Sequence, residues 1–301
     1  AFNPDLKSAV ALSMNGSDIS VNLTGLTVSL EDMRISGDAN IALRNSVPAV
    51  SANLAVNLPN IARAAALVGQ PLNSFGLSAN AAPSLKSNVN ARIQGSNVTA
   101  NLRDLSATLA GASLSGAIDL ALSGSTPNVS GTINANLPST ANLKRALGQG
   151  APDLPKGFGQ AISASTRLSF KSNQLDLTGL KVSLDQNTLT GGVSVNLAGS
   201  VPNINATLQA GNLDLSALNP DDETSSESSA GSGWSKDPID ATALSALNGN
   251  INFKASSINL GKIKLGAADL GVNIDRARAV VSINDLNAYQ GRFGGQLVVN
   301  N

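Results

Sequence analysis

The sequence contains no cysteine and no histidine, and it has few aromatic or charged residues. Without histidine it lacks the side chain that most often moves protons near neutral pH. Without cysteine it lacks thiolate nucleophiles, disulfides and thiolate ligands for zinc. We therefore expect no catalytic residues, no metal site and no cofactor, and we predict that the protein is not an enzyme.

The shortage of charge and of aromatic rings also limits the partners. Charged residues make up 13% of the chain, with 20 basic and 20 acidic side chains, and aromatic residues make up 3%. This balance leaves no positive surface for nucleic acid, and the rings are too few to stack single-stranded bases. No apolar run approaches the roughly 20 residues that a membrane-spanning helix needs. A neutral or hydrophobic partner fits this composition better.

What the sequence does contain is an ungapped repeat. Six positions of the first copy recur at an offset of 79 and then at a further offset of 75. The three sets are Leu23, Leu26, Leu30, Gly37, Leu43 and Pro48; Leu102, Leu105, Leu109, Gly116, Leu122 and Pro127; and Leu177, Leu180, Leu184, Gly191, Leu197 and Pro202. Constant offsets of this kind indicate a modular array.

A fourth, degenerate copy extends the array to the end of the chain. If Phe293 corresponds to Ile35 and Gly295 to Gly37, then Leu297 and Val299 correspond to Ala39 and Ile41. This match requires the preceding turn to be two residues shorter than in the first copy. The array would then end on a repeat strand without a capping unit. Together with a first residue, Ala1, that is not methionine, this suggests a fragment of a longer protein.

We therefore predict one elongated array with units near residues 1–80, 81–160, 161–218 and 234–301. Residues 219–233, which read NPDDETSSESSAGSG, interrupt it. They are acidic, rich in serine and free of large apolar residues, so we expect a disordered loop there.

Within each copy apolar and polar residues alternate, which predicts strands with one apolar and one polar face. The alternation slips by one residue at Thr24-Gly25, and again at Arg103-Asp104 and Thr178-Gly179. A repeated slip that keeps the apolar face predicts a β-bulge in each copy. The next strand of each copy places a glycine on the apolar face, at Gly37, Gly116 and Gly191, which indicates a kink or room for curvature.

The pattern of each unit thus predicts about four antiparallel strands. The pair Asn15-Gly16 is typical of a hairpin turn between two of them. Helices are few. We expect one from Pro59 to Gly69, one from Pro138 to Gly148 and one from Asp240 to Gly249. The predicted fold is mainly β: an elongated, curled antiparallel sheet, or β-groove, built from about four repeats with a few short helices.

Three short helices cannot cover such a sheet, so its apolar face needs another cover. Either two halves of the sheet pack together as a sandwich, or the bulged sheet curls into a trough that holds a hydrophobic ligand. The candidate lipid-contacting residues in the three copies are Ile19, Val21, Leu23, Leu26, Val28, Leu30, Ile35, Ile41 and Leu43; Leu102, Leu105, Leu109, Leu114, Ile118, Leu120 and Leu122; and Leu177, Leu180, Val182, Leu184, Val193, Val195 and Leu197.

The segment after the serine-rich stretch resembles a known family. It combines a tryptophan-serine pair, a Pro-Ile-Asp triplet, a short helical pattern and a run of alternating strands; these are Trp234-Ser235, Pro238-Ile239-Asp240, Leu244 with Leu247, and the residues beyond. This order is similar to the C-terminal region of the AsmA family of bacterial envelope proteins. Tyr289, Gly291 and Gly295 resemble the Y-x-G-x-x-x-G strand pair of that family, and the upstream L-T-G-L-x-V-S-L units resemble its body.

The resemblance implies a periplasmic β-groove whose parent is anchored in the bacterial inner membrane. It also implies a role in moving phospholipids, or other lipids with acyl chains, toward the outer membrane and in outer-membrane homeostasis. We therefore expect the groove to bind and conduct lipids. The alternative is a structural or adhesive β-sandwich array on the cell surface, which would bury the same side chains against each other.

Overall fold

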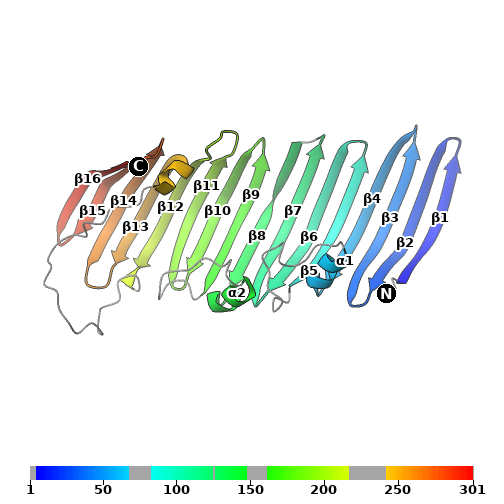
Figure 1. Cartoon of the computed structure of the whole chain (residues 1–301), viewed down its shortest axis with the longest axis horizontal. Helices are drawn as coiled ribbons and strands as arrows, with labels where there is room; N and C mark the ends of the chain where they lie inside the picture. The colour runs from blue at the N-terminus through cyan, green and yellow to red at the C-terminus, as the bar shows by residue number, and fades with distance from the viewer. Residues whose placement is uncertain (1–4, 68–82, 125, 148–160, 217–241, 301) are drawn as a thin grey trace. The chain divides into compact units, whose positions relative to one another are not determined.

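The computed structural model describes residues 5–67, 83–124, 126–147, 161–216 and 242–300 (Figure 1). These residues form mainly β-structure, with sixteen strands in one sheet. The first ten strands are β1 (Asp5–Asn15), β2 (Asp18–Leu30), β3 (Met33–Arg44), β4 (Val47–Leu58), β5 (Ser84–Gln94), β6 (Asn97–Leu109), β7 (Ala112–Ser123), β8 (Thr126–Leu137), β9 (Ile162–Lys171) and β10 (Gln174–Leu184). The last six are β11 (Asn187–Asn196), β12 (Asn203–Asp214), β13 (Asn248–Asn259), β14 (Lys264–Asp275), β15 (Arg278–Ala288) and β16 (Gly291–Asn300).

The strands lie in the sheet in the same order as in the sequence. The chain divides into two compact units, of which unit 1 takes the described residues up to Val182 and unit 2 those from Ser183 onward. In unit 1 the pairs from β1 to β9 are antiparallel, and tight turns join most of them. The predicted turn after Asn15 is one of these: β1 ends there, and Gly16 has a φ of 62°. The mainly β fold, with its long sheet and few helices, is confirmed.

Unit 2 departs from a simple antiparallel meander at one pair. Strand β13 runs parallel to β12, in a register that matches Asn203 with Asn248 and Asp214 with Asn259. The two strands have similar sequences at a constant offset of 45 residues, and side-chain hydrogen bonds join Asn250 to Asn205 at 3.3 Å and Ser257 to Asn212 at 2.9 Å. The sequence analysis predicted an antiparallel sheet and gave no sign of this one parallel pair, because alternation looks the same in parallel and antiparallel strands.

The connection between β12 and β13 contains the predicted disordered loop, residues 219–233, which lies outside the described residues. A parallel neighbour requires the chain to return along the length of the strand before it can pair, so a long connection belongs at this place.

Two of the three predicted helices are present, although their predicted ends, Gly69 and Gly148, lie outside the described residues. They are α1 (Ile61–Leu67) and α2 (Thr140–Leu147), which begin shortly after Pro59 and Pro138 and lie at the same end of the strands of unit 1 (Figure 1). The predicted third helix is only a short 3₁₀ helix, η4 (Thr242–Ala246). Its predicted stop, Gly249, already belongs to β13, where pairing with β12 overrides the weak local helix signal.

The fourth repeat is present, but its register differs from the prediction. Between its bulge and the following turn, β15 has fewer residues than β2 has between its own bulge and turn. The turn after β15 and the turn after β2 have the same length. Counted from the bulge, Gly295 pairs with Ile283 as Ala39 pairs with Leu23, and Phe293 takes the place of Gly37. The missing residues therefore come from the strand ends and not from the turn.

The repeated glycines on the apolar face have a specific structural cause. Gly37, Gly116 and Gly191 have φ angles of 148°, 155° and 154°, a region that other residues rarely adopt. A Cβ atom at Gly37 would overlap the carbonyl oxygen of Asn53 on the neighbouring strand, and the other two glycines meet equivalent carbonyls. The glycines thus allow a close backbone approach at the equivalent position of each of the first three repeats.

We predict that Gly191→Ala lowers the free energy of unfolding by more than about 2 kcal/mol, because the new methyl group would force the backbone of β11 away from β12. The control is Gly211→Ala on β12, where a Cβ atom meets nothing within 4 Å. This change should be neutral or stabilise the protein by up to about 1 kcal/mol. Urea unfolding of both variants is the measurement, and equal stabilities would contradict the proposed backbone constraint.

Candidate functional site

One face of the sheet in unit 1 is apolar across all of its strands. Because residues directly opposite each other on paired strands share a face, the register traces rows along it. One row runs through Leu12, Val21, Ile41, Val50, Ile93 and Val98. Another runs through Leu114, Ala135 and Ala164 on β7, β8 and β9. No charged residue lies on these rows between β1 and β9, so the face is uncharged there.

Unit 2 has an apolar face of the same kind. The rows of β13 to β16 place Ile251, Val272, Val281 and Leu297 side by side, and Phe253, Leu270 and Ile283 in the next row. A small buried cluster joins Ala210, Ala255, Ile258 and Ala268. Alanine dominates this cluster, so the buried core of unit 2 is thin.

The apolar face is only partly buried. Among the described residues no large side chain is less than 2% exposed, while Leu12 on β1 is 63% exposed and Ile41 on β3 is 45% exposed. The described strands contact chiefly their neighbours in the sheet. The described strands of each unit therefore form a single layer, and they do not pack on each other as a sandwich.

The predicted bulges are present and keep the face continuous. On β2 the register passes from Leu23 to Leu26 while β3 advances from Ala39 to Gly37, and on β6 it passes from Leu102 to Leu105 in the same way. Gly25, Asp104 and Gly179 adopt positive φ at the equivalent position of three repeats, with values of 63°, 52° and 60°. Each bulge restores the alternation one residue out of step, which returns the next leucine to the apolar face.

A hydroxyl group on the preceding strand binds the bulge in each of the first three repeats. Ser8 donates to the carbonyl of Thr24 at 3.3 Å, Ser87 to that of Arg103 at 3.1 Å, and Thr166 to that of Thr178 at 3.3 Å. Ser87 and Thr166 stand in apolar rows of the sheet, opposite Val56 and Ile133. The hydrogen bonds satisfy these polar groups within the face. The sequence analysis missed all three, although their constant spacing of 79 residues was a signal.

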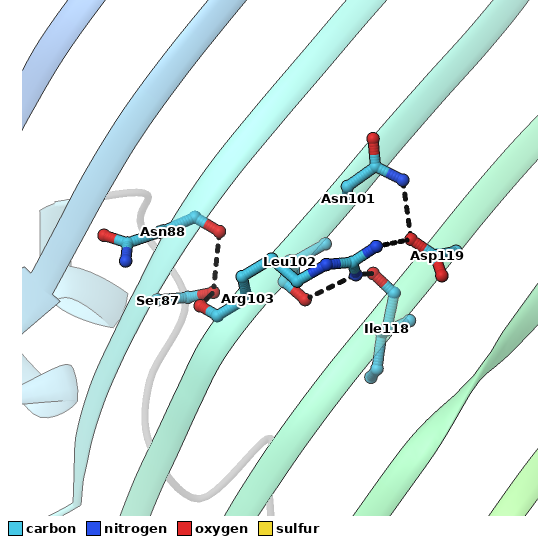
Figure 2. Close-up of polar contacts among 7 residues, drawn as sticks. All are labelled: Ser87, Asn88, Asn101, Leu102, Arg103, Ile118 and Asp119. Atoms are coloured by element: carbon cyan, nitrogen blue, oxygen red, sulfur yellow. Dashed lines mark hydrogen bonds and ion pairs between the residues drawn. The ribbon is translucent and has the colours of Figure 1, made fainter.

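The polar face carries the charges and the amide network. Figure 2 shows the second bulge, where the Arg103 guanidinium reaches across β7 and donates to the carbonyl of Ile118 at 3.4 Å and to the carboxylate of Asp119 at 2.5 Å. Asn101 donates to the same carboxylate at 2.6 Å. In the first bulge the roles differ: the amide of Gly25 donates to Asp38 at 2.9 Å. Both arrangements give the interrupted backbone a polar partner on the polar face.

The predicted lipid-contacting residues lie mainly where the sequence placed them. The register puts Ile19, Val21, Leu23, Leu26, Val28, Leu30, Ile35, Ile41 and Leu43 on one face, and likewise Leu102, Leu105, Leu109, Leu114, Ile118, Leu120 and Leu122. Val193 and Val195 pair with Ala206 and Ile204 on β12. Leu177, Leu180, Val182 and Leu184 alternate along β10 about its bulge and are partly buried.

Two of these residues differ from the expectation. Leu197 lies beyond the end of β11 at Asn196 and is 47% exposed, so it does not join the row. Leu105, which pairs with Gly116, is only 7% exposed. Leu105 therefore supports the fold more than it offers a contact surface.

The described residues contain no group of acidic side chains that could hold a metal ion. In the same part of the chain no helix is long and apolar enough to cross a membrane. Hydrogen bonds from neighbouring side chains hold the pKa of four carboxyl groups below the usual value. These groups are Asp119, Asp214, Asp269 and Asp285. These groups hold strands together on the surface.

We predict that Arg103→Gln raises the pKa of Asp119, which hydrogen bonds from Asn101 and Arg103 hold below its usual value. A lowered pKa in the folded state means that these bonds contribute stability above the unfolded pKa of about 3.9, and that this contribution is lost as the pH falls through the folded value. NMR titration of the Asp119 carboxyl carbon measures the shift. Arg92→Gln is the control, because Arg92 is not among the groups that shift this pKa. An unchanged Asp119 titration in Arg103→Gln would refute the assignment.

Comparison of the chain with protein-family models, with curated proteins and with solved structures gives no match.

Proposed function

We propose that the protein binds phospholipids through their acyl chains on the apolar face of the sheet. The observation that carries this proposal is the uncharged and partly exposed apolar face, which continues over every described strand of unit 1. Exposed apolar patches larger than a few hundred Å² mark binding sites for proteins, membranes or ligands. Strands about 36 Å long and about 4.8 Å apart give the ten strands of unit 1 an area of about 1,700 Å², well above that limit.

The chemistry of the face favours acyl chains over a compact ligand. Its side chains are aliphatic rows that repeat from strand to strand, with hydroxyl groups that already bind the bulges. Such a surface offers many equivalent weak contacts and no set of polar groups that would fix one orientation. A lipid can therefore lie along it with its acyl chains on the apolar rows and its headgroup in water.

In this proposal the protein acts in the bacterial periplasm and resembles the AsmA family, with a parent anchored in the inner membrane. Repeated rows would let phospholipids move along the face between the inner and outer membranes and so support outer-membrane homeostasis. The sequence features behind the resemblance support this assignment, as does the long open sheet. The protein has no enzymatic role in this scheme.

We predict that Val129→Asp weakens the binding of a fluorescent phosphatidylethanolamine by about tenfold or more, because a carboxylate would have to lose water beside an acyl chain. Val129 lies on the apolar face between Leu120 and Phe170. The matched control is Ser130→Asp, the next residue of β8, which is exposed on the other face. Fluorescence titration with both variants, checked for folding by circular dichroism, tests the proposal.

Two results would count against lipid binding. One is a purified wild-type protein that carries no lipid by native mass spectrometry and binds none on titration. The other is equal loss of binding in both variants. A stable dimer that hides the apolar face, seen by sedimentation, would favour the structural or adhesive sandwich array.

The proposed movement of phospholipids along the face leads to a separate prediction. Ile118→Arg combined with Val129→Arg should stop phospholipid transfer by the full-length parent, because two cations in neighbouring rows oppose the passage of acyl chains. Photocrosslinks to lipid from Leu26 and Leu180, on either side of the block, should persist. Leu105 is unsuitable for this test because it is buried. Normal transfer by the blocked protein would leave a binding module that does not conduct.

A further inference from the structure

A hollow of about 490 Å³ opens on the apolar face of unit 1, in the second repeat. This volume is within the range of small-molecule binding sites, about 300 to 1,000 Å³. The hollow lies toward the strand ends that carry the turn between β6 and β7. Its lining is Pro83, Ser84, Leu85, Ala107, Thr108, Leu109, Ala112, Ser113, Leu114, Ala135, Asn136, Leu137, Ile162 and Ala164.

The repeat explains why the hollow is there. Subtracting the offset of 79 maps Ala107 on Val28, Ala112 on Met33 and Ala135 on Val56. The structure keeps this equivalence, because Val28, Ile35 and Val56 are opposite one another in the first repeat, as Ala107, Leu114 and Ala135 are in the second. Three larger side chains of the first repeat are therefore replaced by alanine in the second.

Other lining residues keep the size of their first-repeat counterparts. Leu114 and Leu137 take the places of Ile35 and Leu58 at the same offset, so their size is kept. In the first repeat Met33 is 6% exposed and fills its position, whereas Ala112 is only partly buried. The lining of the hollow thus has smaller side chains at these three positions than the first repeat has.

The lining identifies the class of ligand. It contains no charged residue, and its polar members are Ser84, Thr108, Ser113 and Asn136. Ser84 and Thr108 already bind each other at 2.6 Å through their hydroxyl groups. A charged headgroup would lose its hydration here without gaining a counter-ion, while an acyl chain would replace water on apolar walls.

We propose that this hollow is a resting site for one acyl chain, and that lipid held on the face is bound most tightly at the second repeat. This inference rests on the proposed lipid-binding function and adds a location to it. A chain in the hollow touches side chains below and on both sides, whereas elsewhere on the face it touches one surface. The additional contacts make the hollow the preferred position on an otherwise uniform face.

The test grafts the residues of the first repeat into the second. The filled variant carries Ala107→Val, Ala112→Met and Ala135→Val. The first repeat already has these larger residues at the equivalent positions, Val28, Met33 and Val56. The matched control is Ala100→Val, which also copies a first-repeat residue, Val21, onto β6 but lies outside the hollow. Full-length protein is loaded with a phosphatidylethanolamine that carries a photoreactive group on one acyl chain, or with a photoreactive palmitic acid. The crosslinked peptides are then mapped.

In the wild type we expect crosslinks to concentrate on β7, β8 and β9, near Leu114, Leu137 and Ile162. The filled variant should lose about tenfold of that labelling, since several methylene groups of the ligand lose their contacts. Labelling of β3 and β4 should remain, and Ala100→Val should behave as the wild type. Labelling by both probes or by phospholipid alone supports a lipid site, and labelling by palmitic acid alone supports a site for free fatty acids.

Equal labelling of the first and second repeats in the wild type would overturn the resting site, and this result does not depend on any variant. Undiminished labelling of a folded filled variant would overturn it as well. Either result leaves the proposed lipid binding intact, because lipid is still bound on the face. Failure of both probes to label any part of the wild type would instead refute the proposed function.

Discussion

The structure depends on one constraint: a single-layer sheet can place all of its apolar side chains on one side but cannot bury them within that layer. Each strand alternates strictly enough to keep charge off that side, as the row from Leu12 to Val98 shows. Burial of a large aliphatic side chain contributes about 1.5 to 3 kcal/mol, and here much of this contribution is unrealised because residues such as Ile41 stay 45% exposed. A hydrophobic occupant would supply the missing cover.

The cohesion of such a sheet comes mostly from its backbone hydrogen bonds and from its polar face. Asparagine side chains bind across strands in both units, for example Asn40 to Asn22 and Asn273 to Asn250. Pairs such as Lys254 with Asp269 join neighbouring strands on the surface. Exposed pairs of this kind contribute little individually, but they keep the charges of the chain on one side. That separation leaves the other face without charge.

The repeats show how a uniform surface acquires local differences. The bulge, its hydroxyl partner and the following glycine recur, which keeps the backbone path similar from one repeat to the next. Side chains on that path vary independently. The change from Val28, Met33 and Val56 to three alanines opens a hollow without altering the strand register around it. Local differences in side-chain size can therefore arise in one repeat while the strand register stays the same.

The sequence by itself determined the repeat, the strands, the apolar face and the bulges, because alternation and its slips are local properties of neighbouring residues. It placed the candidate contact residues on one face for the same reason, apart from Leu197, which lies past the end of its strand, but it gave no sign that Leu105 is buried. It did not determine the parallel pairing of β12 with β13 or the short η4, since strand direction and competition with pairing depend on distant segments. Only the tertiary structure showed that Gly37 makes room for the carbonyl of Asn53, and that Ser87 and Thr166 bind bulge carbonyls. Those contacts join residues on different strands, and their geometry follows from the register.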